Sequence, residues 1–217
     1  MTTEELRDWL SNAQERRETR LAFTVQSVLS DGQLRNLLDQ LLPMAQERSA
    51  QLRRDRCGDW HVALRLRYRA GVRIADAYGR GDLRALSPDE RTALTRALAM
   101  VKLAQQHASD PITLARRLFD AARACAVYDS PAVGTAAYGQ VVSAVSVLVW
   151  GQANCQGFSD AYYLLGTLAG LRVRYQTGFK DRLPHLRNTV LLDGRWQTVD
   201  VTAGAFPAGV GKNPSIS

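Results

Sequence analysis

The chain has 217 residues, of which 46% are hydrophobic and 23% are charged. This is the composition of a folded globular protein with enough apolar material for a core. No apolar run approaches the about 20 residues that a membrane-spanning helix needs. The first 20 residues hold no basic segment followed by an apolar one, so no signal peptide is visible. We therefore expect a cytoplasmic protein without a membrane partner.

The formal net charge of +7 raises the question of nucleic-acid binding. The arginines are dispersed through every segment, however, and no recognisable nucleic-acid motif interleaves them with aromatic residues. We interpret them as solvated surface residues and do not expect nucleic acid to be a partner. Three cysteines without a Cys-x-x-Cys pair argue against a disulfide framework and a structural zinc site. No cofactor or metal is expected.

Residues 1–85 are predicted to form an N-terminal α/β region, mainly helical and of unknown role. In chain order its expected elements are a helix from Thr3 to Arg20, a β-like segment over 21–28, a helix over 31–42, a charged surface helix or loop over 45–56 and a strand over 61–69. The strand has alternating apolar and basic positions, which is typical of a half-buried strand. Residues 71–78 can continue as a second strand or form a short helix.

Residues 86–217 are predicted to form the second, larger domain. It opens with two clear helix starts: Ser87-Pro88 with Glu90 makes a capping box, and Asp110-Pro111 repeats the pattern of cap and proline. An apolar run over 141–150 precedes the segment that carries the candidate chemistry. Its periodicity fits either a buried strand or a helix.

Cys155 begins a segment whose apolar residues recur at helical spacing until Gly170. A cysteine in the first helical turn lies near unpaired N–H groups and the positive end of the helix dipole, and both favour the thiolate. The thiolate is the reactive species, so Cys155 is the candidate nucleophile. Cys125, in an apolar-rich stretch, is interpreted as a small buried residue.

Two extended runs, 185–192 and 195–201, flank Asp193-Gly194, which is a strong signal for a hairpin turn. The resulting register puts Leu191 opposite Trp196 and Arg187 opposite Asp200. Side chains of one face repeat every second residue, so Asp200 becomes a diagonal neighbour of His185 on one face. A carboxylate in that position can orient the imidazole of a general base.

The motifs around these residues occur in a fixed order. They are Asn154-Cys155-Gln-Gly-Phe-Ser-Asp-Ala-Tyr, a Gly-Leu turn into a strand, His185-Leu-Arg-Asn188, Asp193-Gly-Arg-Trp196 and Val199-Asp200-Val-Thr202. This order resembles the transglutaminase-like superfamily, whose bacterial members typically carry C-Q-G-[YF]-[AST], H-A-W-N and W-Y-x-V-D-x-T-W. The resemblance covers roughly the C-terminal half of the chain.

The resemblance implies an α+β, papain-like transglutaminase core in which a helix-borne cysteine packs on an antiparallel sheet. It implies a Cys155-His185-Asp200 triad for acyl transfer on peptide or isopeptide amides, with peptide hydrolysis favoured over cross-linking. Gln152, and with it Asn188, are candidates for oxyanion or supporting roles. The expected partner is a peptide or protein substrate.

One departure from the family motif leaves an alternative open. Arginine stands at position 187 in place of the family's tryptophan, and the predicted register puts it across from Asp200. An Arg187–Asp200 ion pair would draw the carboxylate away from His185. The alternative hypothesis is therefore a catalytically impaired binding or scaffold module that has kept the fold.

Overall fold

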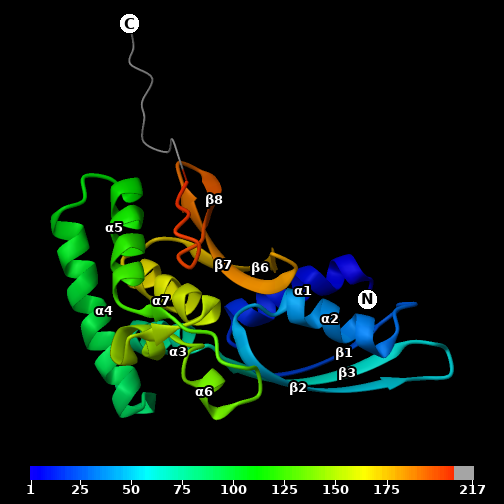
Figure 1. Ribbon diagram of the computed structural model, residues 1–217. Coiled ribbons are helices and arrows are strands. Elements are labelled where there is room, and N and C mark those ends of the chain that lie inside the picture. The colour runs from blue at the N-terminus through cyan, green and yellow to red at the C-terminus, as the bar shows by residue number, and fades with distance from the viewer. Residues whose placement is uncertain (208–217) are drawn as a thin grey trace, which may run out of the picture. The chain divides into compact units, whose positions relative to one another are not determined.

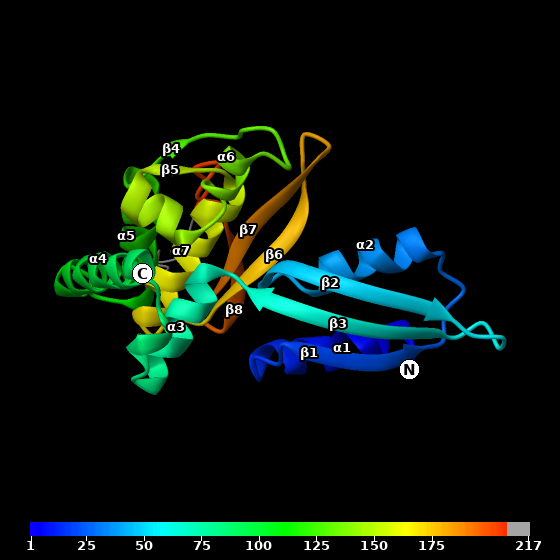
Figure 2. The ribbon, with the colours of Figure 1, turned by 90° about the horizontal axis from the view of Figure 1, so that it is seen from below.

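The structure is a computed structural model that describes residues 1–207 (Figures 1 and 2). The chain divides into two compact units, Met1–Arg69 and Ala70–Ser217. The sequence-based boundary between residues 85 and 86 lies one helix and one short turn further along the chain. No helix of the described part is both long enough and apolar enough to cross a membrane.

The first unit combines a three-stranded antiparallel sheet with two helices. Its elements are α1 (Thr3–Glu15), β1 (Arg20–Val25), α2 (Asp31–Leu41), β2 (Ala45–Arg54) and β3 (Trp60–Tyr68), with the strands in the order β1-β3-β2. Both helices begin with capping boxes, at Thr2 with Glu5 and at Ser30 with Gln33. Both helices begin at the residues that the sequence predicts, but α1 ends at Glu15 rather than at Arg20.

The prediction for residues 45–56 was wrong, because most of this stretch forms strand β2 and pairs antiparallel with β3. Its residues alternate between half-buried and exposed positions. Charged and polar side chains occupy both kinds of position, so the alternation is not visible in hydrophobicity. Pairing with β3, whose apolar residues are buried at every second position, fixes the conformation.

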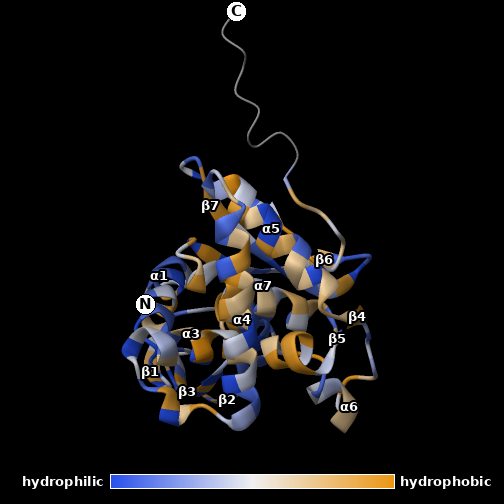
Figure 3. Ribbon diagram, turned by 90° about the vertical axis from the view of Figure 1, so that its left-hand side faces the viewer, coloured by the Kyte–Doolittle hydropathy of each residue, from blue (hydrophilic) through white to orange (hydrophobic). Residues whose placement is uncertain are grey.

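The second unit is built around one buried helix, α7 (Cys155–Leu168). Every residue from Gly157 to Gly166 is buried, and α7 packs against three other α-helices, one π-helical turn and three strands. Figure 3 colours these elements by hydropathy. The other helical segments of this unit are α3 (Ala70–Arg80), η1 (Leu83–Ala85), α4 (Pro88–Gln106), α5 (Pro111–Ala124), α6 (Ala136–Gly139) and the π-helical turn η2 (Ser146–Trp150).

The helix starts at Ser87-Pro88 and Asp110-Pro111 are confirmed. Ser87 and Glu90 form the predicted capping box, and the Asp110 side chain accepts from two backbone N–H groups of α5. Of the two alternatives for residues 71–78, the helix is correct, as part of α3. The apolar run over 141–150 is also helical at its end, in η2.

Up to residue 207, the second unit also contains five strands. β4 (Val127–Tyr128) and β5 (Gln152–Ala153) form a short parallel pair, and β6 (Val173–Lys180), β7 (Leu183–Leu192) and β8 (Arg195–Val199) form an antiparallel sheet in the order β6-β7-β8. Asp193 and Gly194 both have positive φ, of 48° and 73°, and Leu192 pairs with Arg195. The predicted hairpin turn is confirmed, with a loop of two residues, and so is the mixed α+β class.

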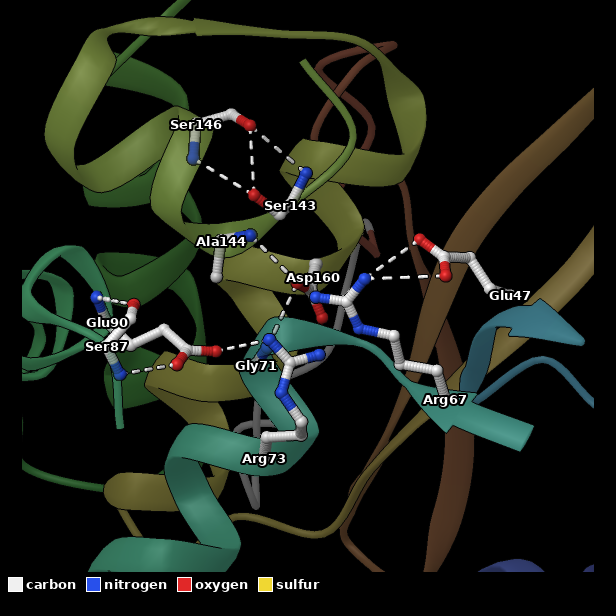
Figure 4. A network of polar contacts seen from close by, with 10 residues as sticks. All are labelled: Glu47, Arg67, Gly71, Arg73, Ser87, Glu90, Ser143, Ala144, Ser146 and Asp160. Atoms are coloured by element: carbon white, nitrogen blue, oxygen red, sulfur yellow. Dashed lines mark hydrogen bonds and ion pairs between the residues drawn. The ribbon is translucent and has the colours of Figure 1, made fainter. Parts of the chain in front are cut away.

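The carboxylate of Asp160, at the centre of α7, is fully buried and connects α7 to three other segments. It accepts hydrogen bonds from Gly71 N at 3.0 Å, Ala144 N at 2.8 Å and Tyr175 Oη at 2.6 Å. Figure 4 shows Asp160 between Gly71 and Ala144. A Cβ at Gly71 would lie 2.6 Å from the Asp160 carbonyl oxygen, so only glycine fits there. These bonds fix α3, the loop before η2 and β6 around α7.

Candidate active site

Cys155 is the first residue of α7, as the sequence predicts, and Asn154 caps the helix. The Asn154 side-chain oxygen accepts from Gln156 N at 2.9 Å and from Gly157 N at 3.3 Å. Cys155 is half-buried and its thiol is free. The cap accepts hydrogen bonds from the N–H groups of Gln156 and Gly157 at the helix start, but not from the Cys155 N–H.

The turn that carries Cys155 is tightly packed from behind. A Cβ at position 157 would lie 2.5 Å from the carbonyl oxygen of Val141 and 2.9 Å from the Cβ of Ala153. Because no real side chain tolerates such contacts, glycine is required at 157. The close approach holds the start of α7 against the chain on either side of η2.

His185 and Asp200 form a buried pair on the antiparallel sheet. The His185 Nε2 lies 2.7 Å from the Asp200 Oδ2, and the two side chains are only 9% and 10% exposed. The other carboxylate oxygen, Oδ1, accepts from Ala203 N at 3.0 Å. Hydrogen bonds between buried polar groups are stronger than those in water, so the pair is held in one geometry. Nδ1 is the ring nitrogen that this bond leaves for other chemistry.

The position of Asp200 follows from the register of the hairpin. Leu191 pairs with Trp196 and Thr189 with Thr198, as predicted. The β7–β8 ladder ends at Asn188 and Val199; Asp200 then forms an isolated bridge with Ala205 as the chain turns back. Asp200 thus lies just beyond the end of the ladder, where its carboxylate contacts His185.

Arg187 does not compete with His185 for Asp200 in the structure, in contrast to the alternative hypothesis. Arg187 Nε donates to the side-chain oxygen of Gln176 at 2.8 Å, while Asp200 is held by His185 and the Ala203 N–H. Within residues 1–207 the Arg187–Asp200 ion pair is therefore not formed. Gln176 lies directly across from Arg187 in the β6–β7 ladder, which makes it the nearer partner.

A hydrogen bond connects the start of α7 with the strand that carries His185. Ser159 Oγ donates to the carbonyl oxygen of Leu186 at 2.8 Å, and Leu186 follows His185 directly. Ser159 is four residues after Cys155, so the two side chains lie on one face of α7 with Cβ atoms about 5–6 Å apart. The helix face that carries Cys155 and Ser159 therefore contacts β7 next to His185 in the sequence, although within residues 1–207 no hydrogen bond joins the Cys155 thiol to His185.

The two proposed supporting residues lie in different surroundings. Gln152 is exposed in β5, three residues before Cys155. Asn188 is fully buried, and its Nδ2 lies 3.4 Å from the Arg174 carbonyl oxygen. Because strand side chains alternate, Asn188 points to the opposite face of β7 from His185. The supporting role of both residues stays a prediction.

Sequence reasoning missed the residues that hold Cys155 in place. No role is predicted for Asn154 from the sequence, although asparagine before a helix is a strong N-cap signal. Gln156 Nε2 donates to Tyr138 Oη at 2.7 Å, which connects the residue after Cys155 to α6. No local pattern indicates this contact, since the two residues are 18 positions apart.

Cys125 is a weaker candidate nucleophile than Cys155. Burial raises the pKa of the Cys125 thiol, so this group stays protonated at neutral pH. Burial also raises the pKa of the Tyr162 hydroxyl on α7. Among the residues that the structure describes, no group of three His, Cys, Asp or Glu side chains is arranged to hold a metal ion.

Comparison with known proteins finds a family match within the second unit. The family model of the transglutaminase-like superfamily matches residues 99–201, which contain Cys155, His185 and Asp200. No curated protein sequence matches the chain.

Solved structures resemble the chain in fold. A crystal structure of a TGase gives a TM-score of 0.50 at 15% identity, covering 95% of this chain and 60% of the other. The periplasmic domain of TgpA from Pseudomonas aeruginosa bound to ethylmercury gives a TM-score of 0.41 at 16% identity, covering 71% and 59%. The chain thus spans about 60% of the length of the TGase chain that it matches. The likeness to the TGase confirms the predicted transglutaminase-like fold.

Proposed function

This chain carries a domain of the transglutaminase-like superfamily, a group of generally cysteine-dependent enzymes, and we propose that it acts on peptide or isopeptide amides through Cys155, His185 and Asp200. The proposed activity is that of a thiol-dependent hydrolase or acyltransferase. The observation that carries the proposal is the buried hydrogen bond between His185 and Asp200. His185 lies on β7, the strand that α7 contacts through Ser159, four residues after Cys155.

In the proposed reaction the Cys155 sulfur attacks the amide carbonyl carbon. The thiol proton passes to Nδ1 of His185, because Asp200 accepts a hydrogen bond from Nε2–H and so fixes the tautomer in which Nδ1 carries a lone pair. The C–N bond then breaks, the amine leaves with the proton from Nδ1, and the acyl group remains on sulfur as a thioester.

The acceptor that resolves the thioester decides between the two reaction types. Water gives the acid and an amine gives a new amide; in both cases His185 takes the acceptor proton and the C–S bond breaks. We propose that hydrolysis predominates, because it requires no binding site for a second substrate. The Cys155 N–H, which Asn154 leaves uncapped, and the exposed Gln152 are the proposed donors to the oxyanion.

Competitive labelling with iodoacetamide at neutral pH tests the nucleophile without knowledge of the substrate. Cys57 is exposed and serves as an internal reference thiol in the same chain. We expect Cys155 to be alkylated faster than Cys57 although Cys155 is half-buried, and His185→Ala to slow only Cys155. If Cys155 reacts no faster than Cys57 and His185→Ala changes neither rate, the proposed thiol–imidazole pair does not exist.

A further inference from the structure

The face of the antiparallel sheet that carries His185 and Asp200 continues beyond them as a band of arginines. Residues paired across the ladders and residues two apart along a strand share this face. We call the part beyond His185 and Asp200 the arginine face. Its members are Arg172, Arg174, Gln176, Arg187, Thr189, Leu191, Trp196 and Thr198.

The arginine face holds three guanidinium groups and no carboxylate. Arg172 and Arg174 are exposed, and neither forms an ion pair within residues 1–207. Other exposed arginines of the chain do have such partners, for example Arg16 with Glu18 and Arg80 with Asp76. Only Arg187 is engaged by a polar side chain on this face, and that side chain is the neutral Gln176. The face therefore has uncompensated positive charge.

Trp196 holds two of these guanidinium groups in place. Its ring centroid lies 4.3 Å from the Arg174 Cζ and 5.8 Å from the Arg172 Cζ, and the side chain is 38% exposed. Stacking on an aromatic ring restricts a guanidinium without using its N–H groups. Those N–H groups remain oriented for bidentate bonds to a carboxylate.

The spacing of the arginines along the sheet matches that of an extended peptide. A strand rises about 3.3 Å per residue. Arg187 is two residues from His185, and Arg174 pairs with Thr189, four residues from His185. The two arginines thus lie about 7 Å and about 13 Å from His185 along the strand. An extended substrate has its second and fourth side chains at the same intervals.

We propose that the arginine face is a substrate subsite that binds acidic side chains of a peptide whose amide reacts at Cys155. The assignment rests on the proposed function, because it is the shared face with His185 that makes the arginines a continuation of the reacting site. The substrate class is accordingly a peptide or protein segment with carboxylates two to six residues from the reacting amide.

A peptide fits this face better than a nucleic acid does. Single-stranded nucleic acids are bound by several aromatic side chains on which successive bases stack. Trp196 is the single aromatic residue among the members of the arginine face, and two guanidinium groups already stack on it.

The test compares two peptides that carry a chloroacetamide group for Cys155 and differ only in charge. One has glutamates at the second and fourth positions from the chloroacetamide and the other has glutamines; each is made with the reactive group at either end. We expect the acidic peptide to label Cys155 about two- to tenfold faster at low salt, as is usual for two exposed ion pairs. The difference in labelling rate between the two peptides should disappear at about 0.5 M salt, because the salt then screens the interaction between exposed charges.

The variant Arg172→Gln/Arg174→Gln should lose the part of the preference that depends on the glutamate at the fourth position, because Arg187 still faces the glutamate at the second position. Its matched control, Arg84→Gln/Lys102→Gln, loses the same net charge at exposed positions away from the sheet and should keep the preference. Both variants should keep the wild-type rate with iodoacetamide, because neither changes the reacting groups.

The outcomes separate this proposal from the proposed function. If iodoacetamide finds no activated Cys155, the function itself fails. If iodoacetamide labels Cys155 rapidly but the acidic and neutral peptides react equally, only the subsite fails. If oligothymidylate slows labelling through Arg172 and Arg174 while a hexaglutamate peptide does not, the face binds nucleic acid and the peptide assignment is overturned.

Discussion

Replacing Asp200 by asparagine is the sharpest perturbation of the candidate site, because it changes the tautomer of His185 with little change in shape. The carboxylate accepts from the His185 Nε2 and from Ala203 N. Asparagine can still accept from Ala203 N through its oxygen, but its NH₂ group then faces Nε2. To receive that hydrogen bond, the imidazole must move its proton to Nδ1, where it can no longer accept the thiol proton.

The structure sets different magnitudes for activity and for stability. Loss of the base should slow acylation of Cys155 by about 10²–10⁴-fold, the usual contribution of general acid–base catalysis. Asp200→Asn keeps both buried hydrogen bonds after the tautomer changes, so the free energy of unfolding should fall by about 1 kcal/mol or less. Asp200→Ala leaves the His185 Nε2 and the Ala203 N–H without an acceptor and should cost about 2–6 kcal/mol.

The assay is the burst of p-nitrophenolate from p-nitrophenyl acetate, an unselective acyl donor that reports acylation without substrate recognition. Urea unfolding of the same variants gives their stabilities. We expect both variants to lose the burst rate and only Asp200→Ala to lose stability. An Asp200→Asn protein that acylates at the wild-type rate would refute the role of Asp200. A loss of burst rate that is explained entirely by the fraction of unfolded protein would refute this role equally.

Three further predictions concern residues that hold α7 or the neighbouring helix α5 in place. Gly157→Ala brings a Cβ to 2.5 Å from the Val141 carbonyl and should lower the free energy of unfolding by about 1–3 kcal/mol. Gly79→Ala, its control at an open position of α3, should raise it by about 0.5–1 kcal/mol; equal effects in urea titrations would contradict the packing argument. Asp160→Ala leaves two buried backbone N–H groups and a tyrosine hydroxyl without this acceptor and should cost about 3 kcal/mol or more, measured in the same way. Hydrogen bonds from Thr113 and Ser109 lower the pKa of Asp110 from 3.8 to about 2. A depressed pKa stabilises the fold above pH 3.8, and the contribution is lost as the pH falls toward 2. Asp110→Asn, which still caps α5, should flatten the thermal stability over this pH range, and an unchanged acid slope would contradict the assignment.

The parts of the fold that local signals determine were predictable from the sequence. The capping box at Ser87 needs only the residues of one helical turn, and it lies where the sequence puts it. The hairpin is similar: Asp193-Gly194 adopts the two positive φ values that set the turn, and the turn sets the register of both strands. That register carried the prediction that His185 and Asp200 share a face. Their hydrogen bond agrees with it.

Strand β2 could not be predicted in the same way, because its conformation comes from its neighbour. Arg48, Gln51 and Arg53 favour no strand by hydrophobicity, and only the ladder with β3 imposes one. The Arg187–Asp200 alternative failed for a related reason. Opposite charges at facing positions suggested an ion pair, but Gln176, two strands away from Asp200, takes the guanidinium instead. Which partner a polar side chain chooses depends on all strands of the sheet.

The candidate site shows the same division between local and long-range causes. Cys155 and its cap are set by adjacent residues, so the helix start could be placed from the sequence alone. The orientation of α7 depends instead on Asp160, whose partners Gly71 and Ala144 lie 89 and 16 residues away. The residues that can carry out chemistry can therefore be found by motif. The buried carboxylate of Asp160, which orients α7, has no sequence signature until its partners are known. Since a buried unpaired carboxylate is costly, Asp160 can be tolerated only where those N–H groups converge, and that requirement fixes where the Cys155 end of α7 must lie.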